Sequence, residues 1–187
     1  MSKIKRLQEL EEFIRRQEME LKKMKVILGE LQGKTSSQAV DYAIKASEVG
    51  KESLTQEGRI VEGVFDGSNM IGPDGKVYSV PANYASKSKL VEGDILKLTI
   101  DPQGNFIYKQ VGPVERRRMI GLLAKDQDRG EFVVIADEHI FKVLYASVTY
   151  FKGEEGDEVV ILVPKDADSK WAAVENIIKK PLRADND

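Results

Sequence analysis

The sequence contains no cysteine, and only one of its 187 residues is a histidine. The absence of cysteine excludes disulfides, thiolate nucleophiles and zinc sites built on cysteine. The lone histidine, His139, has no second histidine with which to build a catalytic triad or a metal cage, and its setting in Asp137-Glu138-His139 is typical of a hairpin turn. We therefore expect no catalytic residue, no metal site and no cofactor.

Long apolar runs are also missing. No stretch approaches the ~20 apolar residues that a membrane-spanning helix needs, and the first residues lack the apolar segment of a signal peptide. Charge is nearly balanced, with 29 Lys and Arg against 31 Asp and Glu and a net charge of −2. This balance gives no general attraction to DNA or anionic lipid, so a nucleic-acid contact would need a local basic patch. We expect a cytoplasmic protein without a membrane partner.

One short segment is similar to a phosphate-binding loop. Residues 29–35, GELQGKT, are one residue too short for the P-loop pattern, and they follow a helical segment whereas a P-loop follows a strand. We interpret the two glycines in this segment as a break in the helix.

The first 31 residues carry a heptad repeat. Over about four heptads, apolar residues recur at two positions three residues apart, and good helix formers lie between them. The first position holds Leu7, Ile14, Leu21 and Leu28, and the second holds Leu10, Gln17, Met24 and Leu31. The 3.5-residue period favours a left-handed coiled coil over a single helix that packs on the rest of the chain. We expect a homo-oligomer through this helix, and docking on the helix of another protein is the alternative. Gln17 is a polar residue inside this seam, where it can fix register and oligomer state.

Residues 32–57 allow two interpretations. Thr35, Ser36 and Ser37 offer an N-cap for a second helix. Its thin apolar stripe consists of Ala39, Val40, Ala43, Ile44 and Leu54. The segment is either a helix that folds back on the first one or an extended arm that leads to Gly58. In both cases we assign residues 1–57 to the helical part of the chain.

From Gly58 onward, short alternating runs bounded by turn residues are typical of strands. Residues 77–100 align without a gap with residues 140–163, and residues 59–65 resemble residues 117–123. We therefore predict two copies of one small β unit and a disordered tail, with the boundaries 58–113, 114–180 and 181–187.

Each copy has about five short strands, which suits an OB-like or an SH3-like barrel. The predicted fold is thus an N-terminal α-helical coiled coil followed by mainly-β tandem small barrels. In both copies a Gly-Asp pair, Gly93-Asp94 or Gly156-Asp157, predicts a turn in which Gly takes a positive φ and Asp caps the backbone.

Two features point toward nucleic acid. One is a basic run between the copies, and the other is a set of aromatic residues with nearby lysines in the first copy, which fits the stacking of bases above a basic groove. The candidate nucleic-acid contacts are Arg116, Arg117, Arg118, Tyr78, Tyr84, Lys87 and Lys89. The alternative is that Phe65 and Phe106 fill the barrel core; period-2 spacing places Phe106 and Tyr108 on one face.

The order of parts resembles the front end of bacterial proteasome-activating ATPases. The matching segments are residues 63–65, 75–76, 81–83, 90–94 and 156–157. The resemblance implies a coiled coil that engages substrates and stacked OB barrels that organise a ring. This sequence carries no ATPase module, so ATP-driven unfolding is not implied. Transcript-cleavage factors are also similar, but residues 33–36 are basic and polar where those factors need an acidic tip.

These observations predict a non-enzymatic oligomeric adaptor that presents two repeated β-barrels on a coiled coil. The expected partner is a protein or a ribonucleoprotein of the translation or transcription machinery, or RNA. Two alternatives stay open: a ring-forming, substrate-engaging accessory of a proteolytic machine, and an enzyme acting on a small molecule.

Overall fold

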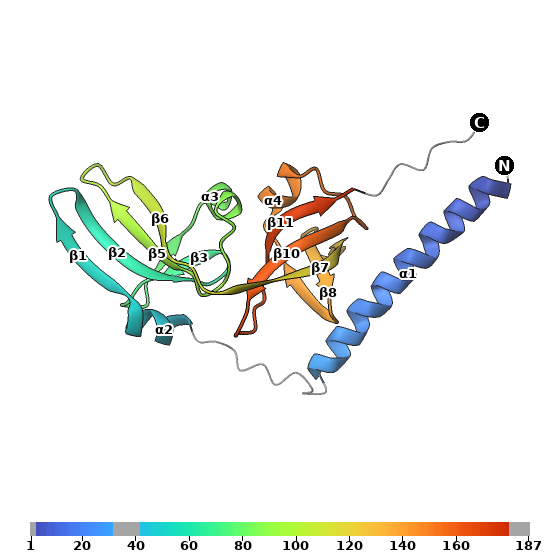
Figure 1. Cartoon of the computed structure of the whole chain (residues 1–187), viewed down its shortest axis with the longest axis horizontal. Helices are drawn as coiled ribbons and strands as arrows, with labels where there is room; N and C mark the ends of the chain where they lie inside the picture. Colours follow the sequence, from blue (N-terminus) through green and yellow to red (C-terminus); the bar gives the residue numbers. More distant parts are fainter. Residues whose placement is uncertain (1–2, 32–41, 180–187) are drawn as a thin grey trace.

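The chain folds into one long helix and two antiparallel sheets, so it is mainly β (Figure 1). The computed structural model describes residues 3–31 and 42–179. Helix α1 spans Lys3–Leu31, which confirms a helix over the heptad segment. The predicted N-cap at residues 35–37 and the tail at 181–187 lie outside the described residues.

A short second helix, α2 (Tyr42–Val49), packs against the first sheet through Ala46, which is fully buried. The helix ends at Val49, and the backbone N–H of the next residue, Gly50, donates to the carbonyl of Ala46 at 2.8 Å. A side chain at this position has no room, because a Cβ on Gly50 would lie 2.4 Å from the oxygen of Ala46 and 2.8 Å from that of Glu62.

Strand β1 (Lys51–Thr55) follows directly and pairs antiparallel with β2 (Gly58–Phe65). The sheet therefore starts before residue 58, where the sequence pattern placed its boundary. The expectation that Leu54 lies on the apolar stripe of the second helix is wrong: Leu54 lies in β1 and is 84% exposed. A run of charged and polar residues becomes a strand here because β2 supplies a ladder partner for every residue from 51 to 55.

The first unit has the strand order β4-β3-β2-β5-β6, with β1 as an additional partner of β2. Its other elements are β3 (Asn69–Ile71), β4 (Val77–Ser79), α3 (Ala82–Lys87), β5 (Ile95–Ile100) and β6 (Phe106–Gly112). Alternate residues of the strands point inward and form the core, in which Val61, Phe65, Leu96 and Leu98 are almost completely buried.

The second unit repeats this plan with the strand order β9-β8-β7-β10-β11. Its elements are β7 (Arg116–Lys125), β8 (Phe132–Ala136), β9 (His139–Lys142), α4 (Tyr145–Tyr150), β10 (Glu158–Pro164) and β11 (Ala173–Ile178). When β7 is matched to β2, the two strand orders coincide, except that β2 also pairs with β1. The predicted internal repeat is therefore confirmed at the level of strand order.

The repeat also holds residue by residue in the segment that follows each helix. Lys89 and Lys152 both have a positive φ, 49° and 52°, and so do Gly93 and Gly156, 94° and 88°. The N–H of each glycine donates to a carbonyl in the second half of β2 or β7, Gly93 to that of Phe65 at 2.8 Å and Gly156 to that of Leu123 at 2.7 Å. The predicted Gly-Asp turns are thus present in both units.

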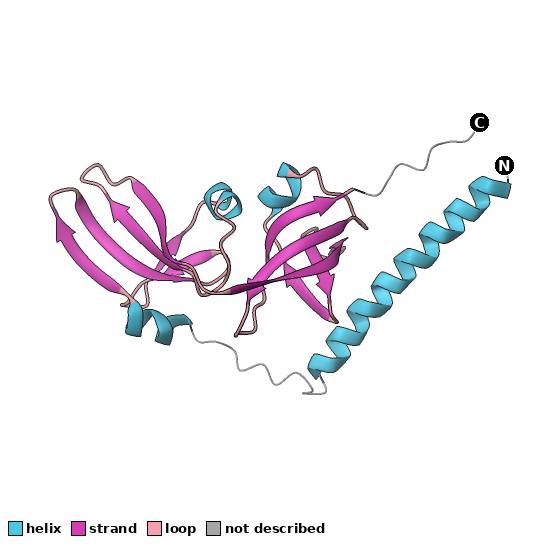
Figure 2. Cartoon of the chain, viewed as in Figure 1, coloured by secondary structure: helices cyan, strands magenta, loops and turns pink. Residues whose placement is uncertain are grey.

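The two units meet through α3, α4 and the loops near them (Figure 2). The hydroxyl oxygens of Ser86 in α3 and Ser147 in α4 are 2.7 Å apart. A small apolar cluster joins Val91 of the first unit to Leu162 and Ala173 of the second. Leu144, just before α4, packs against the core of the first unit. The contact between the units is therefore a packed interface.

Candidate functional site

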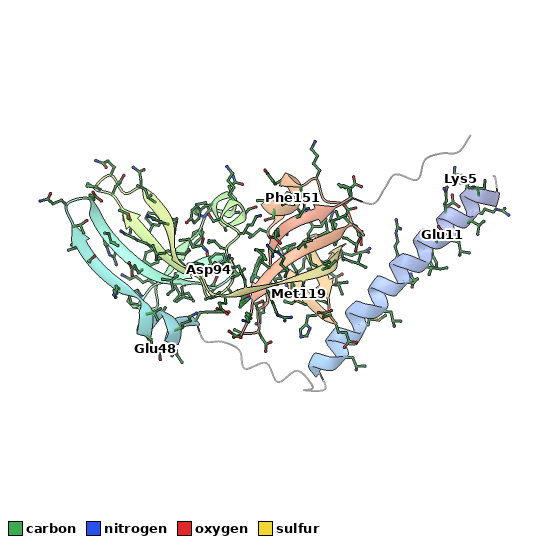
Figure 3. The ribbon with its side chains drawn as sticks, viewed as in Figure 1. Lys5, Glu11, Glu48, Asp94, Met119 and Phe151 are labelled. Atoms are coloured by element: carbon green, nitrogen blue, oxygen red, sulfur yellow. The ribbon has the colours of Figure 1, made fainter. Side chains whose placement is uncertain are left out.

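The first residue of the predicted basic run, Arg116, is held inside the molecule by Asp94. Its Nη2 lies 2.7 Å from both carboxylate oxygens of Asp94, and Asp94 is completely buried. The same carboxylate accepts the backbone N–H groups of Val91 and Val114, each at 2.9 Å. Asp94 thus lies where the two sheets meet (Figure 3). The guanidinium of Arg116 neutralises a buried charge, which gives it a structural role.

The second unit contains a counterpart of this ion pair. Asp157 accepts the N–H of Glu154 at 2.9 Å and the Nζ of Lys179 at 3.0 Å. Lys179 also donates to the carbonyl of Lys152, as Arg116 donates to the carbonyl of Lys89 at 3.1 Å. In each unit a cation that follows the last strand therefore completes the Gly-Asp turn. The sequence alignment did not reveal this pair because the cation is Arg in one unit and Lys in the other, at different distances from the strand end.

The other two arginines of the run do not extend this site. Arg118 makes two hydrogen bonds to Glu175, at 2.6 and 2.8 Å, and this contact, together with the nearby charge of Lys89, holds the pKa of Glu175 below its usual range. Arg117 is exposed, and within the described part of the chain its side chain has no hydrogen bond or ion pair. Because successive residues of a strand point to opposite faces, Arg117 also lies on the other face of β7 from its two neighbours.

The aromatic residues of the first unit form one continuous row. The ring centroids are 6.4 Å apart for Tyr78 and Phe106, 6.5 Å for Phe106 and Tyr108, and 6.0 Å for Tyr108 and Tyr84. We call these four residues the aromatic row. The row follows the seam between β4 and β6, where the structure gives no backbone pairing between the two strands. It brings together Tyr78 and Tyr84, which sequence reasoning had named as candidate contacts.

The members of the aromatic row differ in exposure. Tyr78 is buried, Tyr84 and Tyr108 are half-buried, and Phe106 is 49% exposed. The alternative in which Phe106 fills the core is therefore wrong. Phe106 does share one face of β6 with Tyr108, as its spacing predicted. The hydroxyl of Tyr108 donates to the carbonyl of Ser79 across the seam at 2.7 Å, and burial raises the pKa of Tyr108 to about 12.

The equivalent seam of the second unit is closed by backbone. Lys142 in β9 forms a parallel bridge with Trp171, its N–H donates to the carbonyl of Lys170 at 2.8 Å, and its carbonyl accepts the N–H of Ala172 at 2.9 Å. The side chains are smaller here. Val174 pairs with Ile161 of β10 as Tyr108 pairs with Leu98 of β5, so a valine takes the place of the tyrosine.

The two candidate lysines lie at different places. Lys87 is exposed in the last turn of α3, the helix that carries Tyr84. Lys89 is half-buried beside the interface between the units. Lys87 is therefore the candidate cation closest in sequence to the aromatic row.

A buried glutamate that sequence reasoning missed ties three parts of the chain together. Glu92 is 4% exposed, and its Oε1 accepts the backbone N–H groups of Lys170 and Trp171 at 2.9 and 2.7 Å. Its Oε2 accepts the hydroxyl of Tyr42 in α2 at 2.6 Å. Burial raises the pKa of Glu92, and it also raises the pKa of Tyr42. Trp171 in turn covers Gly67, where a Cβ would lie 2.2 Å from the indole ring.

Helix α1 leaves its heptad positions uncovered. The side chains at these positions are between 49% and 57% exposed for Leu7, Leu10, Ile14, Leu21, Met24 and Leu28. Gln17 is also exposed. The side chain of Leu31 lies outside what the structure describes.

Within residues 3–31 and 42–179, no group of three or more His, Asp or Glu side chains is placed to hold a metal ion. Across the same residues, no helix has both the length and the apolar character to cross a bilayer. His139 is an exposed residue next to a turn, with Nδ1 2.8 Å from the carbonyl oxygen of Asp137. Comparisons with protein-family models, with curated proteins and with solved structures find no match.

Proposed function

We propose that this protein is a non-enzymatic, oligomeric binding protein. Helix α1 forms a coiled coil between copies, and the two β units are OB-type barrels presented to RNA or to the translation or transcription machinery. The observation that carries the proposal is the uncovered heptad seam of α1, whose apolar side chains are about half exposed. A contiguous apolar stripe of this length marks an interaction surface.

The strand arrangement supports the OB-type barrel. In the first unit β2 pairs with β3 and β5, and α3 lies between β4 and β5; in the second unit β7 pairs with β8 and β10, and α4 lies between β9 and β10. The parallel bridge between Lys142 and Trp171 joins the third strand of the second unit to the start of its fifth, which closes the sheet on itself. These features support a five-stranded, partly open Greek-key barrel, the arrangement with which many OB-folds bind oligonucleotides.

The aromatic row is the proposed contact surface. Single-stranded nucleic acids bind by stacking bases on aromatic side chains beside a positive charge, and each base contributes about 1–3 kcal/mol. Phe106 offers the most exposed ring of the row, and Lys87 is an exposed cation on the helix of Tyr84.

Self-association is tested by replacing Ile14 and Leu21 together with Asp. We expect the double variant to have the mass of one chain in sedimentation velocity, because two charges in the seam prevent its burial. The matched control is Gln8→Asp with Arg16→Asp, which puts two aspartates on the same helix outside the heptad positions and should keep the wild-type mass. If the wild-type protein itself has the mass of a single chain at micromolar concentration, the proposal is wrong.

The contact surface is tested with two exposed apolar residues of β6 that point to opposite faces. Phe106→Ala should weaken binding of a fluorescent single-stranded RNA at least fivefold in an anisotropy titration, while Ile107→Ala should not change it. Affinity should also fall as salt rises, because phosphate contacts release counterions. Equal behaviour of the two variants, or binding too weak to titrate, would remove nucleic acid as the ligand.

A further inference from the structure

The seam of α1 contains one polar side chain in its middle. Gln17 lies at a heptad position between the apolar pairs Leu10/Ile14 and Leu21/Met24, and it is exposed in the single chain. Forming the coiled coil buries its amide. A buried amide needs hydrogen-bond partners for both its oxygen and its NH₂ group.

The orientation of the two helices decides whether such partners exist. In a parallel pair in register, each heptad position faces the same position of the other helix, so Gln17 faces the partner's Gln17. Each amide then offers the donor and the acceptor that the other needs. In an antiparallel pair the two kinds of heptad position face each other, so Gln17 faces the partner's Leu21. Two amides are then buried against apolar side chains without a partner.

The flanking charges favour the same orientation. In a parallel coiled coil, the residue that directly precedes the first heptad position, the position of Leu7, lies near the residue five places later in the partner helix. Arg6 precedes Leu7, and the residue five places further is Glu11, which follows Leu10. Arg6 therefore lies beside the partner's Glu11, and these charges attract each other.

We propose that α1 pairs with α1 of a second copy in parallel and in register, with Gln17 facing the partner's Gln17. This inference rests on the proposed self-association and adds its geometry. Both pairs of β units then leave the coiled coil at the same end. Two aromatic rows can engage one long ligand at a high effective concentration, which raises avidity without a new contact.

The absence of cysteine makes the test clean, because a single Gln8→Cys substitution creates the only labelling site. Gln8 is exposed and lies outside the heptad positions. After spin labelling, double electron–electron resonance gives the distance between the two copies of residue 8. Parallel helices 8–10 Å apart place the labels within about 10–25 Å. An antiparallel pair centred on residue 19 separates them by about 22 residues along the axis, or about 33 Å.

The mass is measured on the same labelled sample. Two chains with the short distance support the inference. Two chains with only the long distance overturn the inference but leave the proposed self-association standing. A single chain overturns the proposed self-association as well, and three or more chains overturn pairing.

A second variant tests the role of Gln17 itself. Gln17→Leu in the Gln8→Cys background removes the amide that distinguishes the two orientations. We expect the long distance to appear beside the short one. A distance distribution that stays unchanged would show that Gln17 does not choose the orientation, and it would overturn that part of the argument.

Discussion

The two β units share one backbone plan, but they close it in different ways. The second unit joins its third and fifth strands by backbone hydrogen bonds at Lys142. The first unit fills the same seam with the aromatic row and spans it with a single side-chain bond from Tyr108 to Ser79. The difference teaches that the two units share the Gly-Asp turn and the strand order, whereas the contacts between the third and fifth strands of the repeat differ. We place the binding surface of the first unit at this seam.

The acidic residues that recur in the two units differ in their ion-pair partners and in their burial. Asp94 and Asp157 occupy equivalent turns, but Asp94 is bound by an arginine with 23% of its side chain exposed, and Asp157 by a lysine with 46% exposed. Glu92 and Glu155 are equivalent as well, and only Glu92 is buried. A substitution in the second unit can therefore serve as the control for the equivalent substitution in the first.

The largest effect is expected from Arg116→Ala. It leaves the carboxylate of Asp94 buried without its cation, which should lower the free energy of unfolding by about 3–5 kcal/mol. Lys179→Ala removes a half-exposed lysine, so its loss should stay below about 1 kcal/mol. Urea unfolding measures both. The loss for Arg116→Lys should fall between these two values. A lysine keeps the positive charge, but its one nitrogen cannot replace the Nε and Nη1 groups of Arg116, which donate to the carbonyls of Val114 and Lys89. Equal losses at the two positions would show that the pairs are energetically equivalent.

Glu92→Ala is expected to cost about 2–3 kcal/mol. The substitution leaves the N–H groups of Lys170 and Trp171 and the hydroxyl of Tyr42 without their acceptor. Glu155→Ala is the matched control and should change the free energy of unfolding by less than about 0.5 kcal/mol, because Glu155 is exposed. A similar loss in both variants would mean that Glu92 does not join the units.

The charge of Glu92 can be tested separately with Glu92→Gln, whose amide oxygen still accepts from the two backbone N–H groups. Burial raises the pKa of Glu92 in the folded state, so the folded chain holds this proton more tightly than the unfolded chain. The stabilisation from this group is complete below the ordinary glutamate pKa of ~4.3, and it is lost as pH rises through the raised pKa. We therefore expect Glu92→Gln to gain stability relative to wild type over that window, measured by urea unfolding at several pH values. A constant difference across pH would contradict the raised pKa.

Val174→Tyr gives the seam of the second unit the tyrosine that Tyr108 contributes to the seam of the first unit. Overpacking should cost about 1–3 kcal/mol, and it should push β9 and β11 apart. The amide protons of Lys142 and Ala172 should then exchange faster in hydrogen-exchange measurements. Val174→Ile, a smaller change, should keep most of their protection. If both amides stay protected in Val174→Tyr, side-chain size does not decide how a seam closes.

The smallest effect concerns the hairpin between the second and third strands of each unit. In the first unit a glycine, Gly75, takes the positive φ, while in the second unit Asp137 and Glu138 take it, at 45° and 64°. Glu138→Gly should relieve about 1 kcal/mol of backbone strain and lose about 0.5 kcal/mol to entropy. The net gain should raise the Tm by about 1–2 °C. Glu131→Gly, at a nearby loop position without a positive φ, should give no gain.

The sequence predicted best those features that depend on neighbouring residues. The Gly-Asp turns follow from two adjacent residues, and the repeat follows from residues with fixed spacing. Strand β1 was missed because Lys51–Thr55 has no apolar alternation, and only pairing with β2 makes it a strand. For the same reason the sequence left open whether Phe106 fills the core, since its exposure depends on whether a distant seam is open.

The contacts at the junction could not be predicted because their partners are far apart in sequence. Arg116 is 22 residues from Asp94, and Trp171 is 79 residues from Glu92. An arginine in a run of three gives no local sign that it is committed to a buried carboxylate. The basic run therefore indicated a surface patch, whereas Asp94 binds its first arginine and Glu175 binds its third.

The placement of Arg116 has a consequence for where the chain can be divided. Arg116 is the first residue of the second unit's first strand, yet it completes a turn of the first unit. A chain cut after Pro113 would retain every strand of the first unit but leave Asp94 buried and unneutralised. Recombination at this point would carry the same penalty. The first unit therefore depends on a residue of the second unit's sheet, so a cut between the two units in the sequence would also divide an ion pair.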